Sequence, residues 1–252
     1  MSRTRWLDIA AIALSVAVLA GLFFVSHPRP TSTLTTAPST AHVDRPQPAL
    51  AGRPSALVIG DSYAWGNGLA EMSYGCMAAA KLGLLCHLSG GPGTGYVSGG
   101  PGNRFTLKDI GPSKSFDERL PGLAAEYQPS VVILDGGRND VPAPHDAVFD
   151  AMASTIADVR QNWPTARIVF IRPRLLTRPN DDLGFGDEFF ARLLADPAMR
   201  DVVVVDPINR LAGTNTADML EDDGIHPNRA GDLALSSALV DSLRDHGFAP
   251  TT

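Results

Sequence analysis

Val, Ile and Leu are concentrated in five short runs between residues 56 and 206, and this spacing limits the possible folds more than any other feature of the sequence. Several runs are continuously apolar, as expected for strands covered on both faces of a parallel sheet. We expect strands at 56–59, 84–88, 131–135, 168–172 and 202–206. We expect helices between and after them, at about 68–82, 116–127, 145–162, 187–199 and 229–246. Such alternation predicts an α/β three-layer sandwich with a five-stranded parallel sheet.

The final expected helix has the clearest boundaries. Leu235, Leu239 and Leu243 recur at every fourth position, which places them on one face of a helix. Asn228 is a suitable N-cap for this helix, and Gly247 is placed to end it.

The first 54 residues differ in composition from the rest of the chain. A short basic start precedes an uncharged apolar stretch, Ile9 to Val25. This stretch is short for a bilayer span, which needs roughly 17–25 residues, and long for the apolar region of a signal peptide, roughly 7–15 residues. We expect residues 1–25 to be an uncleaved membrane anchor, with a cleaved signal segment as the alternative. Residues 26–54, rich in Pro, Thr and Ser, are expected to be a linker.

Both alternatives place the remaining domain, residues 55–252, outside the cytoplasm. It is either anchored in the cytoplasmic membrane and facing the cell envelope, or secreted. Cys76 and Cys86 are the only two cysteines, and an even number in an exported chain indicates one disulfide. Two buried free thiols are the alternative.

The charge of the chain argues against nucleic-acid binding. The sequence has 21 Lys and Arg against 27 Asp and Glu, a net charge of −6, and it contains no block of basic residues. It also shows no set of metal ligands at suitable spacing and no nucleotide-binding glycine pattern, so we expect neither a metal nor a cofactor.

Reactive groups in parallel α/β sheets gather beyond the carboxyl ends of the strands. Residues of several chemical types occupy these positions here. They are Gly60-Asp61-Ser62, a glycine-rich turn at 89–96, residues 136–140, and residues 222–228 with an Asp-x-x-His pattern. We therefore expect these stretches to meet at one edge of the sheet.

Ser62 taken alone is more typical of a helix cap than of a nucleophile. A serine hydroxyl becomes nucleophilic when a neighbouring base takes its proton, and His226 is a candidate for that base. Because Pro227 follows it, His226 is expected on an extended or turn segment. Asp223 is placed to orient the imidazole, with Asp222 as a rival.

Stabilisation of an oxyanion needs preorganised hydrogen-bond donors. The glycine turn can supply a backbone N–H, and Ser62 can supply its own. Asn139 can supply a side-chain amide, although an Asn-Asp sequence is more often a turn.

Together these stretches resemble the SGNH hydrolases, also called the GDSL family, over roughly residues 55–247. Gly60-Asp61-Ser62 is similar to the first block of the family, and residues 137–140 are similar to its Gly-x-Asn-Asp block. Asp223 to His226 matches the Asp-x-x-His block. Tyr63 stands where Leu is usual, and the glycine turn resembles a Gly-Gly-Thr-Gly-Tyr variant of exported bacterial members with one residue displaced.

The resemblance implies a flavodoxin-like α/β/α fold and hydrolysis of an ester through an acyl-serine. It implies that Ser62 is the nucleophile, His226 the base and Asp223 the residue that orients it. It also implies an oxyanion hole made by Ser62, Gly93 and Asn139, with Gly95 as the alternative to Gly93.

The predicted function is that of a membrane-tethered or secreted serine esterase. It would hydrolyse acyl esters, for example acetyl esters, of envelope glycans or small molecules. An acyltransferase with the same triad and a catalytically silent envelope-binding module are the alternatives. The expected partners are the ester substrate and, through the N-terminal segment, a membrane; we expect a monomer.

Several residues near the predicted site are candidates for substrate contacts. The aromatic residues Tyr63, Trp65 and Tyr96 are placed to line an acyl or sugar pocket, although core packing is the commoner role for such residues. Arg138 beside Asn139 favours an anionic substrate. The segment 172–188 is long for a loop, so we expect it to border the site.

Overall fold

The computed structural model describes residues 53–108 and 110–249. The expected anchor, 1–25, and the linker as far as residue 52 lie outside these residues. Within the described ranges, no helix combines the length and the apolar character needed to cross a bilayer.

The sheet has five parallel strands, as the sequence predicts. The strands are β1 (Ser55–Gly60), β2 (Leu85–Gly90), β5 (Val131–Asp135), β6 (Arg167–Ile171) and β7 (Val203–Val205). Their spatial order is β2-β1-β5-β6-β7, so β1 and β5 are central and the chain reverses its direction of winding at β1. Each expected strand overlaps an observed one. The sequence analysis missed a small antiparallel pair, β3 (Thr106–Leu107) with β4 (Gly111–Pro112), between β2 and the next helix.

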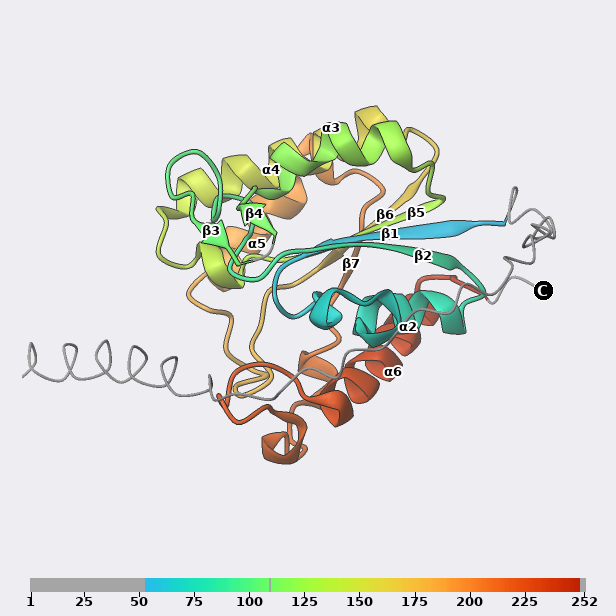
Figure 1. Cartoon of the computed structure of the whole chain (residues 1–252), viewed down its shortest axis with the longest axis vertical. Helices are drawn as coiled ribbons and strands as arrows, with labels where there is room; N and C mark the ends of the chain where they lie inside the picture. Colours follow the sequence, from blue (N-terminus) through green and yellow to red (C-terminus); the bar gives the residue numbers. More distant parts are fainter. Residues whose placement is uncertain (1–52, 109, 250–252) are drawn as a thin grey trace, which may run out of the picture. The chain divides into compact units, whose positions relative to one another are not determined.

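Helices cover both faces of the sheet, which makes three layers (Figure 1). One face is covered by α3 (Phe116–Glu126), α4 (His145–Asn162) and α5 (Gly186–Ala195), and the other by α2 (Tyr74–Lys81) and α6 (Arg229–Asp245). Successive strand residues point to opposite faces. Leu57 and Ile59 accordingly belong to the core under α3 and α4, whereas Ala56 and Val58 belong to the core under α2 and α6. The fold is thus the expected α/β sandwich.

The expected helix at 68–82 is wrong in its first half. Gly66, Asn67 and Gly68 all have positive φ, and Leu69 and Ser73 are extended, so a continuous helix cannot pass through this segment. Two short 3-10 turns, Gly66–Gly68 and Ala70–Met72, replace it, and α2 begins only at Tyr74. The expected helix at 187–199 is likewise too long. It ends at Ala195, because Asp196 is extended and caps a separate 3-10 turn, Pro197–Met199.

The boundaries of the last helix agree with the prediction. The Asn228 side chain accepts hydrogen bonds from the amides of Ala230 and Gly231, which satisfies two donors at the start of α6. Gly247 follows the helix with a φ of +76°, a conformation that favours glycine.

A disulfide joins Cys76 on α2 to Cys86 on β2, as expected. It ties the edge strand β2 to the helix layer beside it. Because the bridge closes a short loop, it limits the motion of β2 relative to α2.

Candidate active site

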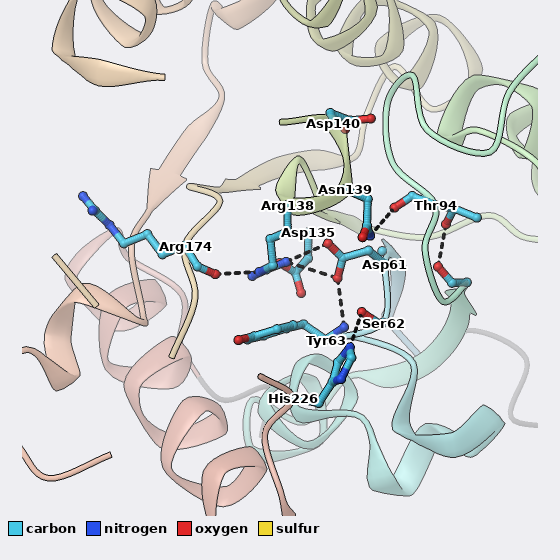
Figure 2. Close-up of polar contacts among 12 residues, drawn as sticks. Asp61, Ser62, Tyr63, Thr94, Asp135, Arg138, Asn139, Asp140, Arg174 and His226 are labelled. Carbon is cyan, nitrogen blue, oxygen red and sulfur yellow. Dashed lines mark hydrogen bonds and ion pairs between the residues drawn. The ribbon is translucent and has the colours of Figure 1, made fainter. Parts of the chain in front are cut away.

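The centre of the candidate site is a buried ion cluster around Arg138, just beyond the carboxyl end of β5. The Arg138 Nη1 donates to both carboxylate oxygens of Asp61, at 3.0 and 3.2 Å, and its Nη2 donates to Asp135 Oδ1 at 2.9 Å. Its Nε donates to the carbonyl of Arg174 at 2.7 Å. Arg138 thus joins the end of β1, the end of β5 and the loop after β6 (Figure 2).

This cluster fixes the turn that carries Ser62. The Asp61 carboxylate accepts the Tyr63 amide at 2.9 Å, and the Asp61 amide donates to the Asp135 carbonyl at 3.1 Å. Tyr74 adds a hydroxyl donor to Asp135 Oδ2 at 2.7 Å. Ser62 lies between two residues whose backbones are held by these bonds, so its side chain is presented in a defined direction.

Two carboxylates share one guanidinium in this cluster. Burial, the largest effect, raises the pKa of Asp61 to about 6; Arg138 opposes this rise, and the neighbouring Asp135 adds to it. Because the Arg138 side chain is only 4% exposed and its donors are already bound, it is not available to an anionic substrate. The expectation that Arg138 favours such a substrate is therefore wrong.

The structure brings Ser62 and His226 together although 164 residues separate them in sequence. His226 Nε2 lies 2.9 Å from Ser62 Oγ, and His226 Nδ1 lies 2.6 Å from Asp223 Oδ2. Figure 2 shows the imidazole directed at the serine from the segment that precedes α6. Asp222, the rival acid, is exposed and forms no hydrogen bond or ion pair within the described ranges.

The turn from Asp223 to His226 is itself well connected. Asp223 Oδ1 accepts the amides of Ile225 and His226, at 2.8 and 3.0 Å. The hydrogen bond from His226, followed by these two amides, lowers the pKa of Asp223 to about 2. Asp223 is therefore ionised throughout the neutral range, which suits a group that stabilises a charged imidazole.

Tyr63 connects the serine turn to the histidine turn. Its hydroxyl donates to the Ile225 carbonyl at 2.7 Å and accepts the Leu176 amide at 3.0 Å. The Arg138 guanidinium lies over its ring, 4.2 Å from the centroid. Tyr63 thus links the buried cluster to the loop that carries His226.

Asp140 anchors the glycine-rich turn after β2. Its carboxylate accepts three consecutive amides, those of Tyr96, Val97 and Ser98, at 2.7–3.0 Å. Asn139 Nδ2 donates to the Thr94 carbonyl at 3.0 Å (Figure 2). Asn139 and Asp140 therefore hold the glycine-rich turn in place.

The geometry favours Gly93 over Gly95 as a backbone donor. The Gly95 amide is used, because it donates to the Ser98 carbonyl at 3.0 Å. The amides of Gly93 and Ser62 have no acceptor within the part of the chain that the structure describes. Gly93 has a φ of +71°, and an added Cβ would lie 3.0 Å from the Phe105 ring, so glycine is strongly favoured there.

Arg119, on α3, is a half-buried contributor that the sequence analysis missed. Its Nη1 donates to the carbonyls of Gly60 and Ser89, at 3.1 and 2.8 Å, and its Nη2 donates to Thr94 Oγ1. It thereby joins the ends of β1 and β2 to the glycine turn. Nothing near Arg119 in sequence signals this role, since its partners are backbone carbonyls of distant strands.

A cavity of about 440 Å³ opens beside Ser62 and His226. Its lining residues come from the loop after β1, the glycine turn, the loop before α6 and the first turn of α6. They are Ser62, Tyr63, Trp65, Gly66, Asn67, Met72, Pro92, Glu221, Asp223, His226, Pro227, Arg229 and Asp232. Tyr63 and Trp65 therefore line the cavity as expected.

One expectation about the surroundings of the cavity is wrong, and another holds only outside the cavity wall. Tyr96 is 2% exposed and packs against Phe116 and Phe170 in the core, so it cannot touch a substrate. The segment 172–188 contributes no residue to the cavity wall; it borders the site behind the cavity, through the Arg174 carbonyl, which accepts from Arg138, and the Leu176 amide, which donates to Tyr63.

Three charged cavity residues, Glu221, Arg229 and Asp232, were not anticipated from sequence. Asp232 lies in the first turn of α6 and is half-buried. Burial raises the pKa of Asp232 to about 7; Arg229 lowers it, and Glu221 raises it further. Across residues 53–108 and 110–249, no group of three or more His, Cys, Asp or Glu side chains is placed to hold a metal.

Comparison with known proteins finds a matching family and a related sequence. A family model described as "GDSL-like Lipase/Acylhydrolase family" matches residues 58–234. A curated relative, a GDSL lipase of Mycobacterium tuberculosis, is 28% identical over 197 residues, which cover 73% of this chain and 78% of the relative.

Solved structures share the fold at low sequence identity. A family two carbohydrate esterase from Clostridium thermocellum is 18% identical with a TM-score of 0.60; the match covers 77% of this chain and 64% of that one, less than two thirds of its length. A psychrotrophic esterase from Pseudoalteromonas sp. is 17% identical with a TM-score of 0.53, covering 76% and 97%. A carbohydrate acetylesterase from Sinorhizobium meliloti is 15% identical with a TM-score of 0.52, covering 77% and 100%.

Replacement of Arg138 by Lys tests the buried cluster. A lysine keeps the charge but cannot reach Asp61, Asp135 and the Arg174 carbonyl at once, so we expect the free energy of unfolding to fall by about 2–4 kcal/mol. Urea unfolding followed by circular dichroism measures this change. The control is Arg192→Lys, at an exposed ion pair with Asp146, which should cost less than about 0.5 kcal/mol. Equal losses in the two variants would contradict the assigned role of the cluster.

Replacement of Asp232 by Asn tests the half-buried carboxyl. An acid whose folded-state pKa is raised adds stability below its unfolded pKa, near 4, and loses that contribution as the pH rises through about 7. Asn does not titrate, so the melting temperature of the variant relative to wild type should rise between pH 5 and pH 8. Differential scanning calorimetry at both pH values measures this difference. A difference that is independent of pH would show that Asp232 ionises as freely in the folded chain as in the unfolded one.

Proposed function

This chain belongs to the GDSL-like lipase/acylhydrolase family, and we propose that it is a serine esterase in which Ser62 forms an acyl-enzyme. The observation that carries the proposal is the 2.9 Å contact between Ser62 Oγ and His226 Nε2, with Asp223 on the other ring nitrogen. A hydroxyl, an imidazole and a carboxylate in this order are the parts that nucleophilic acyl transfer requires. The roles that follow are part of the proposal.

In the first step, Ser62 Oγ bonds to the ester carbonyl carbon while its proton passes to His226 Nε2. Asp223 keeps the proton on Nδ1, so that Nε2 is free to accept, and it stabilises the imidazolium that forms. The bond from the carbonyl carbon to the alcohol oxygen then breaks. The departing alcohol takes the proton from His226, and the acyl group stays on Ser62.

The negative charge that develops on the carbonyl oxygen needs donors beside Ser62. The amides of Ser62 and Gly93 are available for this purpose, since neither has an acceptor within the described residues. Asn139 has a second Nδ2 proton besides the one donated to Thr94. Because Asp140 and Arg119 hold the glycine turn, these donors are positioned before the substrate arrives, which is the condition for efficient stabilisation.

In the second step, water replaces the alcohol. His226 removes a proton from the water, whose oxygen bonds to the acyl carbon, and the acid is released as Ser62 recovers its proton. A sugar hydroxyl in place of water would make the same centre an acyltransferase. Release of free acid distinguishes the two reactions.

We propose that the substrate is a short-chain acyl ester, for example an acetyl ester, of a glycan or a small alcohol. Two structural relatives are a carbohydrate esterase and a carbohydrate acetylesterase, which supports a glycan substrate. The cavity volume of about 440 Å³ lies within the range of small-molecule sites.

We also propose that the enzyme works outside the cytoplasm, held in the membrane by residues 1–25. The basic start and the apolar stretch that follows it support this topology. The disulfide between Cys76 and Cys86 supports it independently, because such bonds persist mainly in oxidising compartments.

Substitution of the proposed catalytic residues tests the function. With the full chain purified in detergent, Ser62→Ala should lower kcat for p-nitrophenyl acetate by 10⁴-fold or more, on the order of the losses seen at serine nucleophiles. Asp223→Asn should lower kcat by about 10²–10⁴-fold, because the imidazole loses its orienting charge. The matched control, Asp222→Asn, should change kcat less than about twofold. Turnover retained by Ser62→Ala in a folded protein would show that the nucleophile is wrongly assigned.

A further inference from the structure

The cavity beside Ser62 has a polar wall that the proposed mechanism does not use. The 3-10 turn after β1 contributes Asn67, next to Trp65. The loop before α6 contributes Glu221, and the first turn of α6 contributes Arg229 and Asp232. All five residues share one cavity with the reactive pair.

Four of these side chains carry polar groups without partners. The carboxylates of Glu221 and Asp232 accept no hydrogen bond within the part of the chain that the structure describes. The Trp65 indole N–H and the Asn67 amide donate none there. Trp65 and Asp232 are half-buried and Asn67 and Glu221 are exposed, so a ligand that enters the cavity meets free acceptors and free donors together.

Arg229 forms no ion pair with the carboxylates of this wall. Its Nη1 lies 3.3 Å from the sulfur of Met77 and 3.7 Å from the sulfur of Met72, and it forms no ion pair with a described carboxylate. The carboxylates of Glu221 and Asp232 therefore stay available to a ligand.

We propose that Trp65, Glu221 and Asp232 form the subsite for the alcohol portion of the ester, and that this portion is a sugar held through its hydroxyls. A hydroxyl donates one hydrogen bond and accepts up to two, so a sugar can satisfy the carboxylates, the indole and the Asn67 amide at the same time. The Trp65 ring supplies an apolar surface against which a sugar ring can lie. The inference rests on the proposed function, because it assumes that Ser62 is the reacting centre.

The chemistry of the wall disfavours two other occupants. A long acyl chain would cover the two carboxylates without giving them a donor, which is unfavourable for charged groups removed from water. A quaternary or primary ammonium group would suit the carboxylates but would leave the donors of Trp65 and Asn67 unpaired. Only a group with both donors and acceptors fits the whole wall.

The test compares two acetates that differ only in their hydroxyls. The first is methyl 6-O-acetyl-glucopyranoside, and the second is (6-methoxytetrahydropyran-2-yl)methyl acetate, which has the same ring type, methoxy group and acyl group but no hydroxyl. With the full chain in detergent, kcat/KM for the sugar ester should exceed that for the second ester by about tenfold or more. Asp232→Asn and Glu221→Gln should each lower this ratio by about tenfold, and Trp65→Phe, which keeps the ring but removes the N–H, by a few fold.

The matched control is Asp150→Asn, an exposed carboxylate on α4 that lines no part of the cavity; it should leave the ratio unchanged. A ratio near one in wild type, or a ratio that the three cavity variants do not change, would overturn the subsite. A faster reaction with acetylcholine that Asp232→Asn abolishes would also overturn it, in favour of a cationic alcohol. Absence of acetate release from every ester, or undiminished release by Ser62→Ala, would instead remove the proposed function, and the subsite with it.

Discussion

The ion cluster of Arg138 with Asp61 and Asp135 is the interaction on which the candidate site depends. It lies in the interior, where an unpaired charge would cost several kcal/mol, so the three side chains can be buried only together. Each comes from a different place: the end of β1, the end of β5 and the turn after β5. Their pairing fixes the two central strands relative to each other at the edge where Ser62 emerges.

The same cluster positions the second half of the site indirectly. Tyr63 packs under Arg138 and donates to the Ile225 carbonyl, next to His226 in the chain. Asp223 then orders this short turn through its bonds to two amides and to the imidazole. A continuous path of contacts thus runs from the buried cluster, through Tyr63, to the exposed turn that carries the imidazole, and the distance from serine to histidine is a consequence of it.

The sequence predicts the sheet and the reactive residues because their signals are local and the rule that joins them is general. Apolar runs mark strands, and the strand ends of a parallel sheet meet at one edge, so Ser62 and His226 could be paired before any coordinates were known. The role of Arg138 could not be predicted, because two of its three partners, Asp61 and the Arg174 carbonyl, are distant in sequence. Tyr96 was misjudged for a related reason, since an aromatic residue after a strand can turn either to the core or to the cavity. The first half of the expected helix at 68–82 was wrong because Gly68 has a positive φ and Leu69 and Ser73 are extended, and the side chains of Leu69 and Ser73 do not signal this locally.

The polar wall of the cavity differs from the Arg138 cluster in how its carboxylates are paired. Arg138 binds both carboxylates of the cluster, Asp61 and Asp135, whereas Glu221 and Asp232 in the wall stay open to a ligand. Both arrangements contribute to catalysis only if Ser62 and His226 react as a pair. The most direct test is to treat the full chain with a fluorophosphonate and map the adduct by peptide mass spectrometry. The account predicts a single adduct on Ser62, formed at least about 100-fold more slowly in His226→Ala. An adduct on another residue, or equally fast labelling of His226→Ala, would contradict it.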